Sequence, residues 1–128
     1  MDYAKLQVNP RQIGYILVVD DNASIRESFR ALLETWGYNV KTADGGQEAL
    51  DIARLNYPAV AFIDLNMPEM DGYELAAQLR RFDGHDALLF AVSAWISERA
   101  ENKLFDDVFE KPINLELVWK LLSALPAA

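Results

Sequence analysis

The chain has 128 residues, a formal net charge of −8, 52% apolar residues and no cysteine. These values fit one globular domain, because a chain of this length buries roughly two-thirds of its unfolded surface on folding. The missing cysteines exclude disulfides, thiol catalysis and thiolate metal sites. The chain has 20 acidic and 12 basic residues, and this acidic balance argues against a surface that binds nucleic acid. Neutralising the phosphates of a nucleic acid needs clustered cations.

The N-terminal region carries no membrane or export signal. No segment approaches the roughly 18 to 20 apolar residues of a membrane span, and the first residues lack the apolar centre of a signal peptide. We therefore expect a cytoplasmic protein. Residues 1–13 are polar and contain Pro10, which indicates a tail or linker ahead of a domain that covers residues 14–126.

A strand and a helix open the predicted domain. Residues 15–19 are a run of β-branched and aromatic side chains that halts at Asp20 and Asp21, as a buried strand followed by a loop does. Apolar residues then recur at helical spacing up to Gly37, a residue type that commonly ends helices. The inward face of this helix is expected to hold Ile25, Phe29, Leu32, Leu33 and Trp36.

The same alternation continues through the middle of the chain. Apolar runs predict strands at residues 59–63 and 87–92, and a short second strand is expected at 39–43. Helical spacing predicts helices at 47–56 and 71–82. The second of these helices is expected to turn inward Leu75, Ala76, Leu79 and Phe82.

The last third of the chain is less regular. A weaker helix is expected at about residues 98–104, followed by a short strand near 108–109. The last helix is expected to start at Asn114, whose side chain suits an N-cap. Its inward side is expected to hold Leu117, Val118, Leu121, Leu122 and Leu125.

Five strand–helix units in strict alternation predict a parallel sheet that helices cover on both faces. Burial on both faces also explains why the first, third and fourth strands are continuously apolar. The expected fold class is α/β, a flavodoxin-like doubly wound five-stranded sheet. Numbered along the chain, its strands are expected in the order 2-1-3-4-5.

Carboxylates follow two strands that this order makes neighbours. In an open α/β sheet, ligands bind outside the carboxyl ends of the strands where the strand order reverses, here between the first and third strands. The first strand ends in Asp20 and Asp21, and the third ends in Asp64. Three anions so close together repel one another, and a hard divalent cation such as Mg²⁺ relieves that repulsion.

A hydroxyl and an ammonium are expected at the same edge, because Ser93 ends the fourth strand and Lys111 follows the fifth. The set suits a phosphoryl group carried on Asp64 as the nucleophile, with a metal ion and Lys111 neutralising the transferred charge. A hydrogen bond from Ser93 to the phosphoryl oxygens makes the reaction a switch. The one histidine, His85, is expected to be a solvated loop residue.

In combination, four ordered motifs, VVDDN, FIDLNMPEMDG, VSA and EKP, resemble those of the receiver domain of bacterial two-component response regulators, the CheY-like family. The resemblance covers about residues 14–126. It implies that Asp64 takes a phosphoryl group from a histidine kinase or a histidine phosphotransfer protein. It also implies that Asp21 binds Mg²⁺ directly, Asp20 binds it through water, and the carbonyl of Asn66 is a further ligand.

The resemblance assigns the remaining polar residues as well. It makes Ser93 the hydroxyl switch, with the small Ala94 leaving room for the phosphoryl group. It pairs Lys111 with the phosphate and implies that the bond between Lys111 and Pro112 is cis. The family docks its histidine-bearing partner on the helix that follows the first strand.

Two features depart from the family pattern. The position three before the lysine, usually Tyr or Phe, is Val108, so the usual aromatic rotamer switch cannot occur there. From Ser93 to Lys111 is 18 positions. That spacing is about four residues, roughly one helical turn, shorter than is common, so we expect a shortened or irregular fourth helix. Trp95 either packs over that helix or restricts water access to the acyl phosphate.

Three hypotheses follow. The first is a phosphorylatable receiver, a signalling module rather than a turnover enzyme. The second is a receiver-like interaction module that no longer uses phosphate. The complete set of carboxylates, hydroxyl and lysine disfavours it, while Val108 and the short fourth helix keep it open. The third is a haloacid dehalogenase-like phosphohydrolase, disfavoured because Asn66 replaces the second Asp that such enzymes use as acid and base. The sequence specifies neither the kinase and output partner nor whether the chain forms a dimer.

Overall fold

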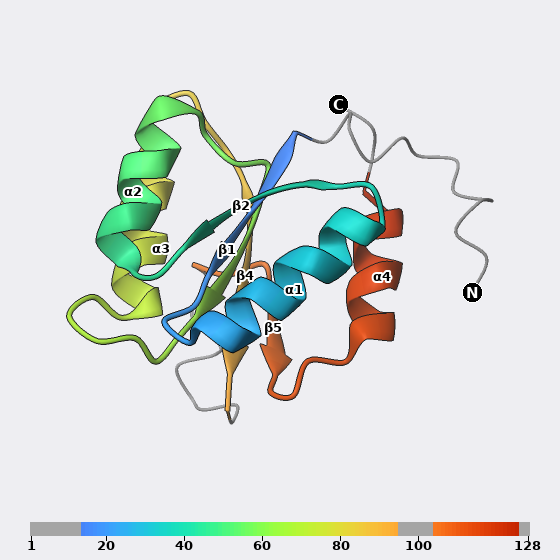
Figure 1. The fold of residues 1–128 in the computed structure, drawn as a ribbon. Helices are drawn as coiled ribbons and strands as arrows, with labels where there is room; N and C mark the ends of the chain where they lie inside the picture. Colours follow the sequence, from blue (N-terminus) through green and yellow to red (C-terminus); the bar gives the residue numbers. More distant parts are fainter. Residues whose placement is uncertain (1–13, 95–103, 126–128) are drawn as a thin grey trace.

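The computed structural model describes residues 14–94 and 104–125, in which a five-stranded sheet lies between two layers of helices (Figure 1). The strands are β1 (Tyr15–Val19), β2 (Asn39–Ala43), β3 (Val60–Asp64), β4 (Leu88–Ser93) and β5 (Asp107–Glu110). The helices are α1 (Ala23–Thr35), α2 (Gly46–Leu55), α3 (Gly72–Arg80) and α4 (Leu115–Ser123). In the described part of the chain, no helix is long and apolar enough to cross a membrane.

The sheet has the predicted topology. Its strands are all parallel and lie in the order β2-β1-β3-β4-β5, so the predicted flavodoxin-like order 2-1-3-4-5 is confirmed. Helices α1 and α4 cover one face, and α2 and α3 cover the other (Figure 1). Because every strand runs the same way, all five carboxyl ends meet at one edge of the sheet.

Two strands start and end one residue later than their apolar runs predict, at 60–64 instead of 59–63 and at 88–93 instead of 87–92. Asp64 is the last residue of β3, and Ser93 is the last residue of β4. Asp64 lies opposite Val92, and Ser93 lies opposite Glu110. The hydrogen-bonded ladder continues through these polar residues because strand pairing uses main-chain groups. An apolar run in the sequence therefore does not mark the last paired residue of a strand.

The core on the α1 and α4 face is rich in aromatic residues. Trp36 and Trp119 meet edge to face with ring centroids 5.2 Å apart, and Phe29 meets Phe62 at 5.0 Å. Such pairs contribute about 0.5–1.5 kcal/mol each beyond the area they bury. Trp119 is therefore a core residue rather than part of an exposed aromatic surface, with 6% of its surface accessible.

Two predicted core residues are exposed. Ile25 is 42% accessible and Leu117 is 51% accessible, so their predicted inward positions are wrong. Each is the third residue of its helix, α1 or α4, and lies in the first turn. Helical spacing selects a face of the helix, but the first turn of these two helices lies beside the sheet edge, where the described residues do not cover that face.

The N-cap prediction for the last helix is confirmed, since the side chain of Asn114 accepts hydrogen bonds from the backbone N–H groups of Glu116 and Leu117.

Three predictions concern residues that the structure does not describe. They are the tail at residues 1–13, the position of Trp95, and the helix expected at 98–104, of which only Leu104 is described. The expected shortening of the helix between β4 and β5 therefore stays a prediction.

One arginine anchors the chain where it enters β5. The guanidinium of Arg80 donates to the carbonyl of Ala87 at 2.7 Å and to the carbonyl of Leu104 at 2.9 and 3.1 Å. It also pairs with the carboxylate of Asp106 at 2.9 Å, which accepts the backbone N–H of Leu89 at 2.8 Å. This network joins the end of α3 to β4 and β5, and so supports the strand that leads to Lys111.

Candidate functional site

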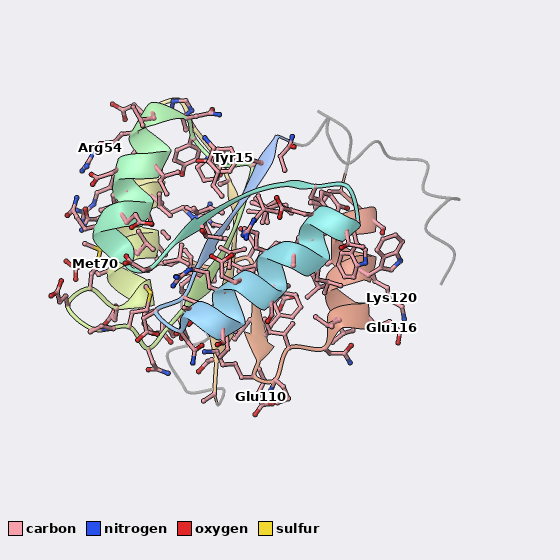
Figure 2. The ribbon with its side chains drawn as sticks, viewed as in Figure 1. Tyr15, Arg54, Met70, Glu110, Glu116 and Lys120 are labelled. Carbon is pink, nitrogen blue, oxygen red and sulfur yellow. The ribbon has the colours of Figure 1, made fainter. Side chains whose placement is uncertain are left out.

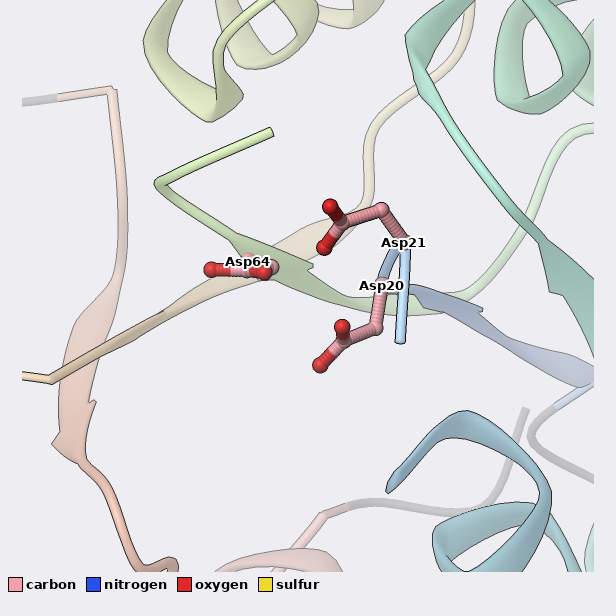
Figure 3. A group of neighbouring side chains, drawn as sticks. All are labelled: Asp20, Asp21 and Asp64. Carbon is pink, nitrogen blue, oxygen red and sulfur yellow. The ribbon is translucent and has the colours of Figure 1, made fainter. Parts of the chain in front are cut away.

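Three carboxylates converge at the carboxyl edge of the sheet (Figure 3). Asp20 and Asp21 follow β1, and Asp64 ends the neighbouring β3. One oxygen from each lies within 4.8 Å of the others. Asp20 and Asp64 are buried, at 5% and 4% accessible, whereas Asp21 is exposed. The cluster thus has two buried carboxylates and one that faces solvent.

Local hydrogen bonds orient the two buried carboxylates. The backbone N–H of Asn22 donates to Oδ1 of Asp20 at 2.9 Å, and the N–H of Asn66 donates to Oδ1 of Asp64 at 3.0 Å. Arg26 donates to the backbone carbonyl of Asp20 at 2.8 Å. In each carboxylate, Oδ1 therefore accepts the backbone N–H of the residue two positions later. This bond fixes the direction in which Oδ2 points.

Lys111 lies between the two free oxygens. Its Nζ is 3.5 Å from Oδ2 of Asp20 and 3.5 Å from Oδ2 of Asp64. Its backbone N–H donates to the carbonyl of Ser93 at 2.7 Å, which ties the end of β5 to the end of β4. The bond between Lys111 and Pro112 is cis, as predicted. Four chain segments therefore bring their charged or polar groups to one point.

The surroundings of Asp64 disfavour its charged form. Burial raises the pKa of Asp64 above its usual value, and repulsion from Asp20 raises it further. The N–H of Asn66 and the ammonium of Lys111 lower it, but they do not cancel the effect of burial. The single lysine therefore leaves the three carboxylates with an excess of negative charge that a cation can offset.

The first residue of α3 packs directly on the backbone at Asp64. A β carbon added to Gly72 would lie 2.6 Å from the carbonyl oxygen of Asp64 and 2.9 Å from Cα of Leu65. The N–H of Gly72 donates to the carbonyl of Leu65 at 3.2 Å, while Asp71 caps the helix by accepting the N–H of Glu74 at 2.9 Å. A glycine is needed here because the helix and the end of the strand touch.

The other predicted site residues take different positions around this point. Ser93 is 4% accessible and follows the strand partner of Asp64 by one residue. Asn66 is exposed in the loop after β3. Val108 is half-buried against the core on the α2 and α3 face. His85 lies in the loop between α3 and β4, exposed and stacked on the Tyr57 ring at 4.9 Å, away from the carboxylates.

An apolar groove beside the carboxylates was not predicted. It encloses about 420 Å³ between the start of α1 and the loop after β5, and it is lined by Ile25, Phe29, Ala94, Lys111, Pro112 and Ile113. Sequence analysis missed it because Ile25 was assigned to the core. The available signal was the presence of Ile25 and Ile113 within five residues of charged site residues.

The donor set fits a magnesium ion. Mg²⁺ prefers carboxylate, carbonyl and water oxygens, and the cluster offers three carboxylates with solvent access at Asp21. Asp20, Asp21 and Asp64 could hold the ion, and the exposed loop at Asn66 adds a backbone carbonyl nearby in the chain. No sulfur or imidazole ligand belongs to this cluster, so a softer metal is not favoured.

The five-stranded parallel sheet in the order β2-β1-β3-β4-β5 is the fold of a response regulator receiver domain. The sequence model of the response regulator receiver domain family matches residues 16–123. The chain therefore belongs to the response regulator receiver domain family and is a signalling domain of two-component systems.

Curated relatives are similar in sequence over most of this chain. The response regulator MprA of Mycobacterium sp. (strain KMS) is 40% identical over 114 residues, which are 86% of this chain and 49% of that protein. The probable transcriptional regulator ycf27 of Porphyra purpurea is 36% identical over 116 residues, 88% of this chain and 48% of that protein. The chain spans about half the length of these relatives.

Solved structures agree on the fold. The chemotaxis protein CheY4 of Vibrio cholerae superposes with a TM-score of 0.77 at 29% identity, covering 88% of this chain and 98% of that one. The response regulator TrrA of Thermotoga maritima, in complex with Mg²⁺ and BeF, superposes with a TM-score of 0.73 at 31% identity. That match covers 84% of this chain and 97% of TrrA.

Proposed function

We propose that Asp64 accepts a phosphoryl group from a phosphohistidine on a histidine kinase or a histidine phosphotransfer protein. The observation that carries this proposal is the convergence of Asp64 with Asp20, Asp21 and Lys111 at the strand-order reversal of a receiver fold. The similarity to TrrA, whose structure holds Mg²⁺ and BeF, supports the same assignment.

In the proposed step, a carboxylate oxygen of Asp64 attacks the phosphorus atom. A P–O bond to Asp64 forms while the P–N bond of the phosphohistidine breaks, and the imidazole leaves with the bonding electrons and takes up a proton from solvent. Attack needs the ionised form of Asp64. Lys111, at 3.5 Å, favours that form by lowering the pKa of Asp64 against the effect of burial.

The charged residues around Asp64 prepare the site for the transferred group. Asp21, Asp64 and the carbonyl of Asn66, with Asp20 through water, would hold Mg²⁺, which would supply positive charge to offset the three carboxylates and the incoming phosphoryl oxygens. Lys111 can exchange its contact with Asp64 for one with a phosphoryl oxygen, since its ammonium already lies beside the acceptor.

Ser93 is the proposed sensor of phosphorylation. It ends β4 next to Asp64, and its backbone carbonyl accepts the N–H of Lys111, so a shift of Ser93 towards the phosphoryl group bears directly on the end of β5. Ala94 follows with a small side chain. Val108 provides no aromatic ring, so transmission relies on the backbone of β4 and β5 rather than on a rotamer change at that position.

The apolar groove between α1 and the loop after β5 is the proposed seat of the histidine-bearing partner. It adjoins Lys111, and Ile25 and Ile113 present apolar surface within reach of the acceptor site. The two alternatives are weaker. An interaction module that does not use phosphate would not need the acidic cluster or Lys111. A phosphatase with rapid turnover would need a carboxylate as acid and base at position 66, where this chain has Asn66.

The decisive experiment treats the protein with acetyl phosphate and Mg²⁺ and follows its intact mass. We expect one added phosphoryl group that depends on Mg²⁺ and is absent in Asp64→Asn. Transfer from a phosphorylated histidine phosphotransfer protein then tests the physiological donor class. An unmodified wild-type protein under both donors would refute the phosphoacceptor role, and fast release of inorganic phosphate would indicate the hydrolase.

A further inference from the structure

The loop between β3 and α3, residues 65–71, ends near the start of α2 (Figure 1), and Met70 of this loop lies against Gly46, the first residue of α2. Met70 is half-buried and packs against the core on the α2 and α3 face (Figure 2). A β carbon added to Gly46 would collide with Sδ of Met70 and lie 2.9 Å from its Cγ and 3.0 Å from its Cβ. The Met70 side chain thus fills the space that a larger residue at position 46 needs.

The neighbouring glycine does not share this constraint. Gly45 has an extended backbone with φ −172°, which any residue adopts, and a β carbon there would meet nothing within 4 Å. A substitution at Gly46 has to move Met70, whereas the same substitution at Gly45 has room. Rotation of the Met70 side chain can move Sδ and Cγ away, but Cβ of Met70, at 3.0 Å, still has to give by a few tenths of an ångström.

The displaced loop is the one that carries Asn66. At its near end, the N–H of Asn66 is bonded to the carboxylate of Asp64 at 3.0 Å. At its far end, the N–H of Met70 is bonded to the carbonyl of Pro68 at 2.8 Å, and Asp71 is committed to capping α3. Three residues separate Met70 from Asn66, so we expect a movement of Met70 to pass through this short stretch to Asn66.

We propose that Met70, seated against Gly46, is a positioning residue that aims the backbone carbonyl of Asn66 at the metal, so that the contact between α2 and this loop sets the affinity for Mg²⁺. The inference rests on the proposed function, because it concerns the ion at that site. Mg²⁺ demands near-ideal octahedral geometry, so a ligand displaced slightly binds it less well. Changes to groups that orient metal ligands typically weaken metal binding about 10- to 100-fold.

An amide NMR titration with MgCl₂ measures the Mg²⁺ dissociation constant of each folded protein. We expect Gly46→Ala to raise that constant about tenfold, and the matched control Gly45→Ala to leave it near the wild-type value. Met70→Ala, which removes the contact without crowding, is expected to weaken binding as well. Met70→Leu, which keeps a side chain of similar volume, is expected to retain it.

These variants separate a positioning role from a loss of stability. Urea unfolding in EDTA gives the stability of each variant, and the titrations are made where every protein is folded. Mg²⁺ binding by Gly46→Ala equal to that of Gly45→Ala would overturn the inference, as would unchanged binding by Met70→Ala if Gly46→Ala does not fold. A wild-type protein that shows no Mg²⁺-dependent shifts would instead overturn the proposed function itself.

Discussion

Replacing Asp64 with Asn should stabilise the protein when no metal is present. At an effective dielectric constant of about 20, two unit charges 4.8 Å apart repel by about 3.5 kcal/mol, and an oxygen from each of Asp20 and Asp21 lies within that distance of Asp64. Attraction to Lys111 at 3.5 Å returns about 5 kcal/mol by the same relation. The remaining repulsion is about 2 kcal/mol, less some screening at the exposed Asp21, so we expect a gain of about 1–2 kcal/mol.

The asparagine keeps the shape of the side chain and its oxygen acceptor for the N–H of Asn66. Urea unfolding in EDTA near neutral pH, followed by the fluorescence of the buried Trp36 and Trp119, measures the difference. Saturating Mg²⁺ should reverse the order, because a ligand at 100 times its dissociation constant stabilises the wild type by about 2.7 kcal/mol. Asp64→Asn loses much of that gain.

The difference in stability between Asp64→Asn and the wild type should depend on pH, in a direction that the pKa of Asp64 sets. The folded-state pKa of Asp64 is raised by burial and by Asp20, so the folded protein holds this proton more tightly than the unfolded chain. The stability that Asp64 gains from this tighter proton binding is fully present at pH values below the unfolded-state pKa of Asp64, and it is lost as the pH rises through the folded-state pKa. The advantage of Asp64→Asn should therefore shrink on acidification. An Asp64→Asn protein less stable than the wild type in EDTA would refute this electrostatic account.

Three further outcomes are expected. Lys111→Met should slow phosphorylation by acetyl phosphate about 100-fold, because it removes the cation beside the acceptor; a normal rate would contradict the role of Lys111. Gly72→Ala should lower the free energy of unfolding by about 1–3 kcal/mol, since its β carbon meets the Asp64 backbone at 2.6 Å; urea unfolding checks this. Asn114→Ala should cost about 1 kcal/mol through the lost N-cap, and Asn114→Asp, which keeps an acceptor, should not.

The sequence allowed the sheet order and the acidic cluster to be predicted before any coordinates. Apolar runs ended by Asp20, Asp64 and Ser93 are local signals, and parallel strands necessarily bring their carboxyl ends together. Residue spacing did not reveal where each side chain meets another element. Ile25 and Leu117 have the spacing of core residues, yet they lie in first turns that the described part of the sheet edge leaves exposed.

Local patterns in the chain specify the identity and order of the chemical groups, because each group lies at the end of a strand that its own neighbours define. The way in which those groups are held depends on the packing of distant elements. Lys111 lies 3.5 Å from both Asp20 and Asp64, and Gly46 leaves the space that Met70 fills. These contacts join residues distant in the chain, and their geometry depends on the packing of whole elements, which local patterns do not specify.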